Sequence, residues 1–377
     1  MTTVTEPVSE PVVARSSLGL SGYLSRGAFW LVLLVLLMLP ARSVDFANFC
    51  SLAAIYAIVG LSLNIIIGYT GQLSLGHQGF LGVGSLVAAN LVTNKQLPFG
   101  VGLAGGALAG ALVALVLGLV ALRITGLYLA LITLVFGLAV ASSLFQLGSL
   151  TNNGSGLAAN RPEMFASNGR FYLLCLVFMV VVFYFDTRLT ASKTGRALLA
   201  LKENERVAEA FGINVTVYKL IAFALAGAIV GLAGGLYVFR SQQFSGQNFQ
   251  GQTGLNLALL FVVMVTVGGL GNRVGVVVAS AFFALIDYLL DKLFLAHSVM
   301  THLQNVPILK GYYGTNKGSL AGLIGAGLLL QTLIFNPGGL GAQLRPLSRW
   351  LSGHRFSMHD DTADAGPGAV EGSSVRA

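Results

Sequence analysis

Long apolar runs, nearly free of charged side chains, recur along most of this chain and restrict what it can fold into. Most of them approach the length that crosses the hydrocarbon core of a bilayer. Apolar residues make up 55% of the 377 residues and another 48 are glycine, which is more apolar surface than a soluble domain could hide. We therefore expect an all-α protein, built as a polytopic bundle of transmembrane helices.

About ten segments are long enough to span a membrane or fall a few residues short of it. They cover residues 27–39, 46–69, 73–93, 97–122, 124–150, 171–185, 220–239, 255–271, 274–290 and 318–335. The first has the length of a signal-peptide core, but the Pro-Ala-Arg of residues 40–42 is a poor cleavage site, so we interpret it as a span. The membrane domain is then 27–340, flanked by tails at 1–26 and 341–377 that we expect to be disordered and cytoplasmic.

One charged segment, residues 187–219, separates the sixth predicted span from the seventh. It holds six Lys or Arg and three Glu residues, whereas only 10% of the whole chain is charged. Such a segment must lie in water at one bilayer face, and its net positive charge favours the cytoplasmic face. With about ten spans both termini lie on that side. The loop of residues 147–170 then lies outside.

Residues 197–211 of this charged segment are predicted to form a short helix along the membrane surface. The partial apolar stripe of this helix consists of Leu198, Leu201, Val207, Ala208 and Phe211. Charged residues occupy much of the remaining surface, and Gly212 follows where a left-handed C-cap is expected. Such a helix can dock onto a soluble partner. The alternative is a solvated amphipathic loop.

A second informative stretch, residues 61–90, combines glycines with polar side chains inside the membrane domain. Gly68 and Gly71 are expected to break or kink the helix, which is tolerated at membrane depth only inside protein or beside a watery cavity. Taken as a helix, the stretch brings Ser74, His77 and Gln78 to one face, together with Ser85. Three further glycines would allow close helix packing, namely Gly76, Gly79 and Gly82.

These polar residues have two interpretations of equal weight. In the first they line a passage for a solute, and the candidate residues are Asn64, Gln72, Ser74, His77 and Gln78. In the second they hydrogen-bond to neighbouring helices and only hold the bundle together. The spans contain few ionisable groups, which favours a neutral or zwitterionic solute over metal ions or protons.

The sequence contains no catalytic or nucleotide-binding pattern. There is no GxxxxGK[ST], HExxH or GxSxG motif and no cluster of Cys and His with metal-ligand spacing. We therefore expect neither an enzyme nor a metal protein, and no cofactor of its own. Energy for any transport would come from a partner.

Cys50 and Cys175 both fall towards the outer face, so they could form a disulfide, although buried cysteines usually act as small apolar residues.

Both stretches resemble a known family, the permeases of ABC importers for branched-chain amino acids of the LivM kind. Glu209-Ala210-Phe211-Gly212 stands where that superfamily carries its Glu-Ala-Ala…Gly coupling signature, with Phe211 in place of a small or aliphatic residue. The stretch 68–77, GYTGQLSLGH, resembles the family's most recognisable membrane motif. The resemblance covers roughly residues 45–340, with the two motifs in the expected order.

The resemblance implies a permease subunit in the inner membrane of a bacterium. It would assemble with a second, homologous permease subunit, two cytoplasmic ATPases that bind the ATP, and an external solute-binding protein, which the 147–170 loop could meet. The residues that would couple it to the ATPases are Arg196, Glu203, Glu209, Ala210 and Gly212.

Two alternatives stay open at this point. A permease for urea or short-chain amides shares these motifs. An ion-coupled secondary transporter would need ligands for its coupling ion inside the membrane, where Asp287 is a weak candidate. The stretches 67–71 and 267–271 also resemble each other, a faint echo of a duplicated helical unit.

Overall fold

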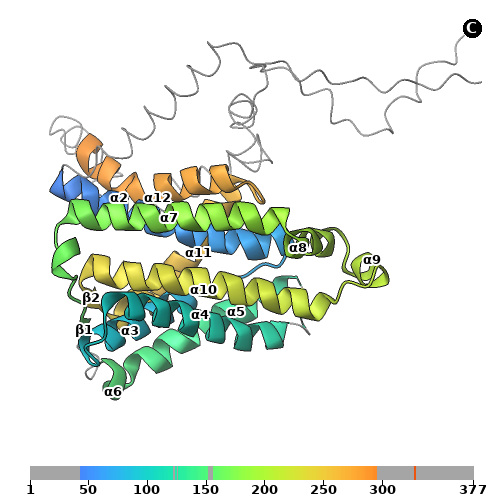
Figure 1. The fold of residues 1–377 in the computed structure, drawn as a ribbon, viewed down its shortest axis with the longest axis horizontal. Coiled ribbons are helices and arrows are strands. Elements are labelled where there is room, and N and C mark those ends of the chain that lie inside the picture. Colours follow the sequence, from blue (N-terminus) through green and yellow to red (C-terminus); the bar gives the residue numbers. More distant parts are fainter. Residues whose placement is uncertain (1–42, 122–123, 125, 152–155, 295–326, 328–377) are drawn as a thin grey trace, which may run out of the picture. The chain divides into compact units, whose positions relative to one another are not determined.

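The computed structural model describes residues 43–121, 124, 126–151, 156–294 and 327. All the described residues belong to one compact unit. The described part is mostly helical, with one small two-stranded sheet (Figure 1). The predicted all-α fold class is therefore confirmed for this part, whereas the predicted spans 27–39 and 318–335 lie outside the described residues.

The helices follow the apolar runs in order. The long ones are α2 (Val44–Leu63), α3 (His77–Thr93), α4 (Phe99–Ala121), α5 (Leu127–Ser143), α7 (Asn168–Ala191), α10 (Val215–Ser241), α11 (Gly251–Gly268) and α12 (Arg273–Phe294). The short elements are the π-helical turn η2 (Asn64–Gly68), η3 (Leu144–Gln146), α6 (Gly148–Thr151), β1 (Leu157–Ala158), η4 (Glu163–Phe165), α8 (Lys193–Glu203), α9 (Glu205–Ala210), β2 (Gln243–Phe244) and η5 (Gly246–Phe249).

The long helices form two packed groups. Helices α3, α4 and α10 contact one another, and α2 contacts α7, α11 and α12 (Figure 1). Contacts between α2 and α10 join the groups. Among the five helices long enough to cross a membrane, these two are the most enclosed, because 94% of the most apolar part of α2 and 67% of that of α10 is buried, against about a third or less in α4, α5 and α7.

Glycines set the close packing of α3, α4 and α10. A Cβ on Gly84 of α3 would lie 2.6 Å from the Cα of Gly231 in α10, and one on Gly110 of α4 would lie 2.8 Å from the same atom. The hydroxyl of Ser85 donates to the carbonyl oxygen of Gly234 at 2.8 Å. Small residues of this kind let helix backbones meet inside a membrane, where no hydrophobic effect drives helices together.

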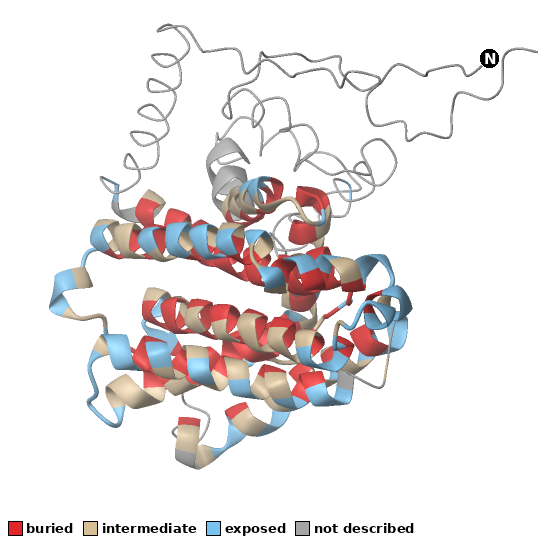
Figure 2. Ribbon diagram, turned by 45° about the vertical axis from the view of Figure 1, so that its right-hand side comes forward, coloured by how far each residue is buried: buried red, intermediate tan, exposed pale blue. Residues whose placement is uncertain are grey.

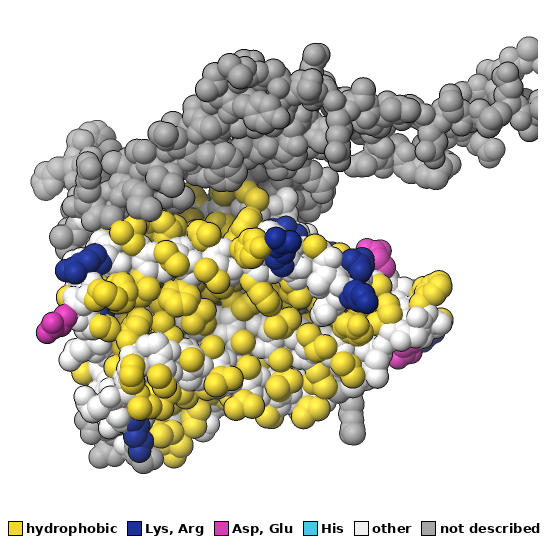
Figure 3. All heavy atoms as spheres, viewed as in Figure 1, with side chains coloured by type: hydrophobic (Ala, Val, Ile, Leu, Met, Phe, Trp, Pro, Cys, Tyr) yellow, Lys and Arg dark blue, Asp and Glu magenta, His cyan; other side chains and the backbone are white. Residues whose placement is uncertain are grey.

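The outer surface is apolar where α4, α5 and α7 face outward. Leu108 and Leu112 of α4 and Val135 of α5 are more than 60% exposed. Figure 3 shows apolar side chains over the middle of the visible face and charged ones near its two ends, and Figure 2 shows buried residues on the sides where helices meet. Among the described residues, five helices are long and apolar enough to cross a membrane, namely α2 with η2, α4, α5, α7 and α10. The chain is therefore a multi-pass membrane protein, and the count of about ten spans remains a prediction.

Three sequence-based boundaries were wrong. Helix α3 begins at His77 rather than at residue 73, because residues 71–76 are not helical. Helix α7 extends to Ala191, into the charged segment. The single helix predicted over 197–211 is divided into α8 and α9 at Asn204, whose extended backbone (φ −162°, ψ 113°) lets its side chain accept hydrogen bonds from the N–H groups of Arg206 and Val207 as the N-cap of α9.

The expected apolar stripe on that helix was also wrong in part. Leu198, Leu201 and Ala208 are buried, whereas Val207 is 50% and Phe211 is 82% exposed. The turn at Asn204 rotates α9 away from the direction of α8, so one helical stripe cannot continue across it. Cys50 and Cys175 are both buried free thiols, so the disulfide does not form in this structure.

Candidate functional site

The stretch 64–77 breaks the path of the chain between α2 and α3. Helix α2 widens into the π-helical turn η2, after which the N–H of Gln72 donates to the carbonyl oxygen of Ile66 at 3.3 Å. Gly71 then takes a left-handed backbone (φ +72°), which only glycine adopts without strain. Residues 71–76 follow without helical structure until α3 starts at His77. We call residues 69–76 the broken segment.

The predicted passage residues are all buried around this broken segment. They are Asn64 in η2, Gln72 and Ser74 in the broken segment, and His77 and Gln78 in the first turn of α3. The Ser74 hydroxyl lies 3.4 Å from Nδ1 of His77. Within the described part, His77 Nε2, Gln72 Oε1, Asn64 Nδ2 and both amide atoms of Gln78 have no hydrogen-bond partner. A buried polar atom without a partner costs about 1–3 kcal/mol.

Helix α5 covers this cluster from the side. The N–H of Leu75 donates to the hydroxyl of Thr133 at 2.9 Å. A Cβ on Gly79 would lie 2.8 Å from the Cα of Gly137, and one on Gly137 would lie 2.6 Å from Nε2 of Gln78. The Gln78 amide therefore packs directly on a glycine of α5.

The four polar residues predicted to share one helix face do not all lie on it. Ser74 lies before the helix, and Ser85 donates to the carbonyl oxygens of Leu81 and of Gly234 in α10. Ser85 therefore holds α3 to α10. Gly76 and Gly82 are also tightly packed, against Thr133 and Phe145 respectively.

At one end of the bundle, α8 and α9 form a projection (Figure 1). Buried Leu198 and Leu201 attach α8 to the bundle, and an ion pair of 2.7 Å between Lys219 and Glu205 ties α9 to the start of α10. Gly212 (φ +80°) ends α9 in the expected left-handed conformation. Its N–H donates to Glu209, and the N–H of residue 213 donates to Ala208, which completes a Schellman cap.

All five predicted coupling residues are on the exposed surface of this projection. They are Arg196 and Glu203 in α8, Glu209 and Ala210 in α9, and Gly212 after it. The Arg196 side chain donates to the carbonyl oxygen of Ala191 at 2.9 Å, so it also closes the corner between α7 and α8. The projection thus offers both charge and, through Val207 and Phe211, exposed apolar surface to a partner in water.

The projection and the broken segment, far apart in the sequence, meet in the structure. A Cβ on Gly71 would lie 3.5 Å from Cγ and 3.9 Å from Cα of Lys202 in α8. The last turn of α8 therefore packs on the left-handed residue of the break. No motif in the sequence indicates this contact.

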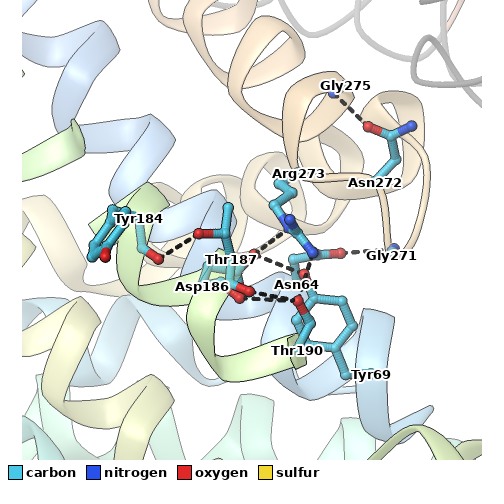
Figure 4. Close-up of polar contacts among 10 residues, drawn as sticks. All are labelled: Asn64, Tyr69, Tyr184, Asp186, Thr187, Thr190, Gly271, Asn272, Arg273 and Gly275. Atoms are coloured by element: carbon cyan, nitrogen blue, oxygen red, sulfur yellow. Dashed lines mark hydrogen bonds and ion pairs between the residues drawn. The ribbon is translucent and has the colours of Figure 1, made fainter. Parts of the chain in front are cut away.

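A group of charged and polar residues beside this contact was not predicted. Tyr69 donates to Oδ2 of Asp186 at 2.8 Å, and Nε of Arg273 lies 3.0 Å from the same oxygen (Figure 4). Arg273 also donates to the hydroxyl of Thr190 at 2.6 Å. Asp186 is fully buried. In the sequence, Asp186 and Arg273 lie at the ends of apolar runs, where they resemble ordinary loop charges. The predicted topology puts both residues on the same side of the membrane, and this was the one indication that they could pair.

The two glycine-punctuated stretches meet at the same place. The N–H of Gly271, between α11 and α12, donates to Oδ1 of Asn64 at 2.8 Å. A Cβ on Gly68 would lie 2.8 Å from the backbone nitrogen of Gly271. The resemblance between 67–71 and 267–271 thus marks two turns that pack against each other.

The apolar belt, the broken central helix and the charged projection define a polytopic membrane transport protein. The chain belongs to the family of the permease component of the branched-chain amino acid transport system, whose model matches residues 46–309. This confirms the resemblance to LivM-type ABC importer permeases.

Curated relatives agree with this family. The chain is 30% identical over 271 residues to the high-affinity branched-chain amino acid transport system permease protein LivM of Salmonella typhimurium, and equally to that of Escherichia coli. These matches cover 64% of this chain and 62% of each relative. A probable LivH permease of Methanocaldococcus jannaschii is 25% identical over 191 residues, which is 50% of this chain and 54% of that protein. No solved structure matches the chain.

Proposed function

We propose that this chain is one membrane subunit of an ATP-driven importer for branched-chain or similar hydrophobic amino acids in a bacterial inner membrane. A second, homologous permease subunit, two cytoplasmic ATPase subunits and an external binding protein would complete the importer. The ATPase subunits would bind the ATP, and this chain would bind no cofactor. The LivM and LivH relatives, which are named as permeases for branched-chain amino acids, support the cargo class and the pair of permeases.

The contact between α8 and the broken segment is the observation that carries this proposal. An exposed, charged projection serves as a docking site for a soluble ATPase, and Lys202 of that projection packs on Gly71. A displacement of the projection would therefore reach the one place where the central helix is interrupted. Coupling between a docking site and a passage requires such an element shared by both.

Reconstitution with the ATPase subunits and the binding protein tests the docking role. Glu209 is exposed and makes no side-chain contact that α9 needs, so Glu209→Lys should leave the protein folded and inserted while reducing ATP-driven uptake strongly. Lys95→Glu, at an exposed residue between α3 and α4 and outside the 147–170 loop, is the control for a reversed charge and should leave uptake unchanged. Uptake at the normal rate by the Glu209 variant would refute docking through α9.

The cargo is tested on the partner binding protein. We expect leucine, isoleucine or valine to bind and to be taken up. Binding of urea or short-chain amides in their place would assign the importer to the alternative cargo. Uptake driven by an ion gradient without ATP would assign the chain to secondary transporters.

We further propose that Asn64, Gln72, Ser74, His77 and Gln78 line the passage. The support is the group of buried polar atoms without partners around the broken segment, next to a glycine contact between α3 and α5. His77→Ala and Gln78→Ala should change transport rate or solute preference with little loss of stability. Ser85→Ala is the control for a residue that holds helices together, and it should lower the melting temperature. If the His77 and Gln78 variants behave like the Ser85 variant, the lining role is wrong.

A further inference from the structure

The group around Asp186 joins three segments that come from distant parts of the chain. Asp186 lies near the end of α7, Tyr69 begins the broken segment, and Arg273 begins α12 (Figure 4). The Oδ2 atom of Asp186 accepts a hydrogen bond from the Tyr69 hydroxyl at 2.8 Å and forms an ion pair with Nε of Arg273 at 3.0 Å. One carboxylate oxygen therefore holds the break to two other helices.

Helix α7 leads straight into the projection. It ends at Ala191, and α8 begins at Lys193 after the single residue Ser192, whose hydroxyl accepts from the N–H of Gly195 at 3.2 Å. Gly195 lies so close to the backbone of Leu189 and Thr190 that a Cβ would lie 2.6 Å from the Thr190 Cα. Because the backbones of α7 and α8 are tightly packed at this corner, we expect a tilt of α8 to move the last turns of α7 with it.

The broken segment is thus attached to the projection at two points. One is the packing of Lys202 on Gly71, and the other runs from α8 through α7 and Asp186 to Tyr69. At the first point Lys202 lies beside Gly71 without a hydrogen bond between them within the described residues, so this point can transmit only a push. The second is a hydrogen bond to a charged acceptor, which also resists pulling and is stronger than a neutral hydrogen bond.

A buried carboxylate is costly, and one oxygen of Asp186, Oδ1, has no hydrogen-bond partner within the described residues. A buried ion pair adds little net stability compared with apolar residues of the same size, because desolvation offsets the attraction. Hydrophobic packing would hold α7 to α2 without this cost, so stability alone does not explain Asp186.

We propose that Asp186, Tyr69 and Arg273 form the link that transmits movement of α8 and α9 to the broken segment. They are positioning residues for transport and do not contact the solute. Through them the broken segment moves with the projection, both when the ATPase subunits close and when they open. This inference rests on the proposed function, because it presumes that ATPase subunits move the projection.

The test uses the complete importer in proteoliposomes and two conservative variants. Asp186→Asn keeps the shape and removes the charge, and Tyr69→Phe removes a single hydroxyl. Arg188→Gln is the control, since Arg188 lies on the same helix two residues away but is exposed and, within the described residues, bonded to Tyr184 only. Solute imported per ATP hydrolysed should fall about fivefold or more in both variants, the loss expected for one coupling interaction. The control should match the wild type.

A second measurement follows the broken segment without any need for import. Leu73 is 40% exposed, so Leu73→Cys, with Cys50 and Cys175 replaced by alanine, reports the accessibility of the segment to a thiol reagent. Its labelling rate should change on ATP binding in the otherwise unchanged protein, and the change should disappear when Asp186→Asn or Tyr69→Phe is added.

The outcomes separate the two proposals. A wild-type importer that hydrolyses ATP but takes up no hydrophobic amino acid refutes the proposed cargo, and the labelling measurement still decides the link. A melting temperature that falls while solute per ATP and the labelling change stay normal shows that the group is only structural and overturns the inference. If Asp186→Asn does not fold, Tyr69→Phe decides alone, and normal coupling in that variant refutes the link.

Discussion

The two ends of the bundle use their charged residues in different ways. At the end with β1 and β2, Arg161 donates to the carbonyl oxygens of Phe239 and Arg240, each at 2.7 Å, and to the Asn168 side chain at the same distance. At the end with α8 and α9, Asp186 binds Arg273 across two helices. Arg161 therefore caps backbone carbonyl groups, whereas Arg273 neutralises a carboxylate.

The difference separates a fixed end from a coupled one. The last carbonyl groups of a helix have no partner within it, and a cation there satisfies them and favours the helix dipole. Arg161 does this for α10, and packed aromatic rings support the same end, with Phe145 and Phe244 in an edge-to-face contact at 5.4 Å. At the other end the strong contacts run between segments that meet at glycine turns. We infer that the first end keeps its shape while the second one moves.

The largest expected difference between the ends is their side of the membrane. Single cysteines at Glu163, near β1, and at Lys193, at the start of α8, should react from opposite sides, because the predicted topology places α7 across the bilayer. Labelling with a membrane-impermeant reagent in intact cells and in inverted vesicles checks this, on a background without Cys50 and Cys175. Both sites reacting from one side would contradict the comparison.

Removal of the Arg161 side chain should give the largest change in stability. Arg161→Ala leaves the carbonyl groups at the end of α10 without donors and also removes the stacking of its side chain over Phe171, whose ring centre lies 4.2 Å from the guanidinium carbon. We expect a loss of about 3 kcal/mol in the free energy of unfolding. Thermal unfolding in detergent measures it. Arg170→Ala, an exposed neighbour, is the control, and an equal effect there would refute a special role for Arg161.

A methyl group at the corner between α7 and α8 should have a moderate effect. Gly195→Ala forces the added Cβ against the backbone of Leu189 and Thr190, so we expect a loss of about 1–3 kcal/mol together with weaker coupling of transport to ATP hydrolysis. Gly100→Ala, in α4, has no neighbouring atom within 4 Å of its new Cβ and should be neutral. Normal stability and normal coupling of transport to ATP hydrolysis in the Gly195 variant would show that the corner between α7 and α8 can adapt to the added methyl group.

The smallest effect on stability is expected at the tip of the projection. Phe211 is 82% exposed, so Phe211→Ala should change the free energy of unfolding by less than about 0.5 kcal/mol. It should nevertheless weaken copurification of the ATPase subunits, because an exposed aromatic side chain is a typical anchor of an interface. Met164→Ala, 64% exposed at the opposite end, should change neither property. Unchanged ATPase binding in the Phe211 variant would remove this residue from the interface.

Only part of the candidate site could be predicted from the sequence. The glycines at 68 and 71 and the polar residues that follow them indicated a break, and the left-handed Gly71 lies there. Gly212 likewise has the left-handed backbone that its position after a helix suggested. The roles of the passage and coupling residues stay predictions. Asp186 and Arg273 were missed because each one alone is an ordinary charge at the end of an apolar run.

The sequence by itself determined the helices and the class of environment. Each predicted apolar segment between residues 46 and 290 contains most of a long helix, because hydrophobicity over a span is a local property of the chain. Only the tertiary structure decided which of these helices are central, where α8 ends and α9 turns away, and that Lys202 meets Gly71. It also decided that Asp186 is buried, since the cost of burying its charge is offset by Arg273 and Tyr69, which distant segments supply.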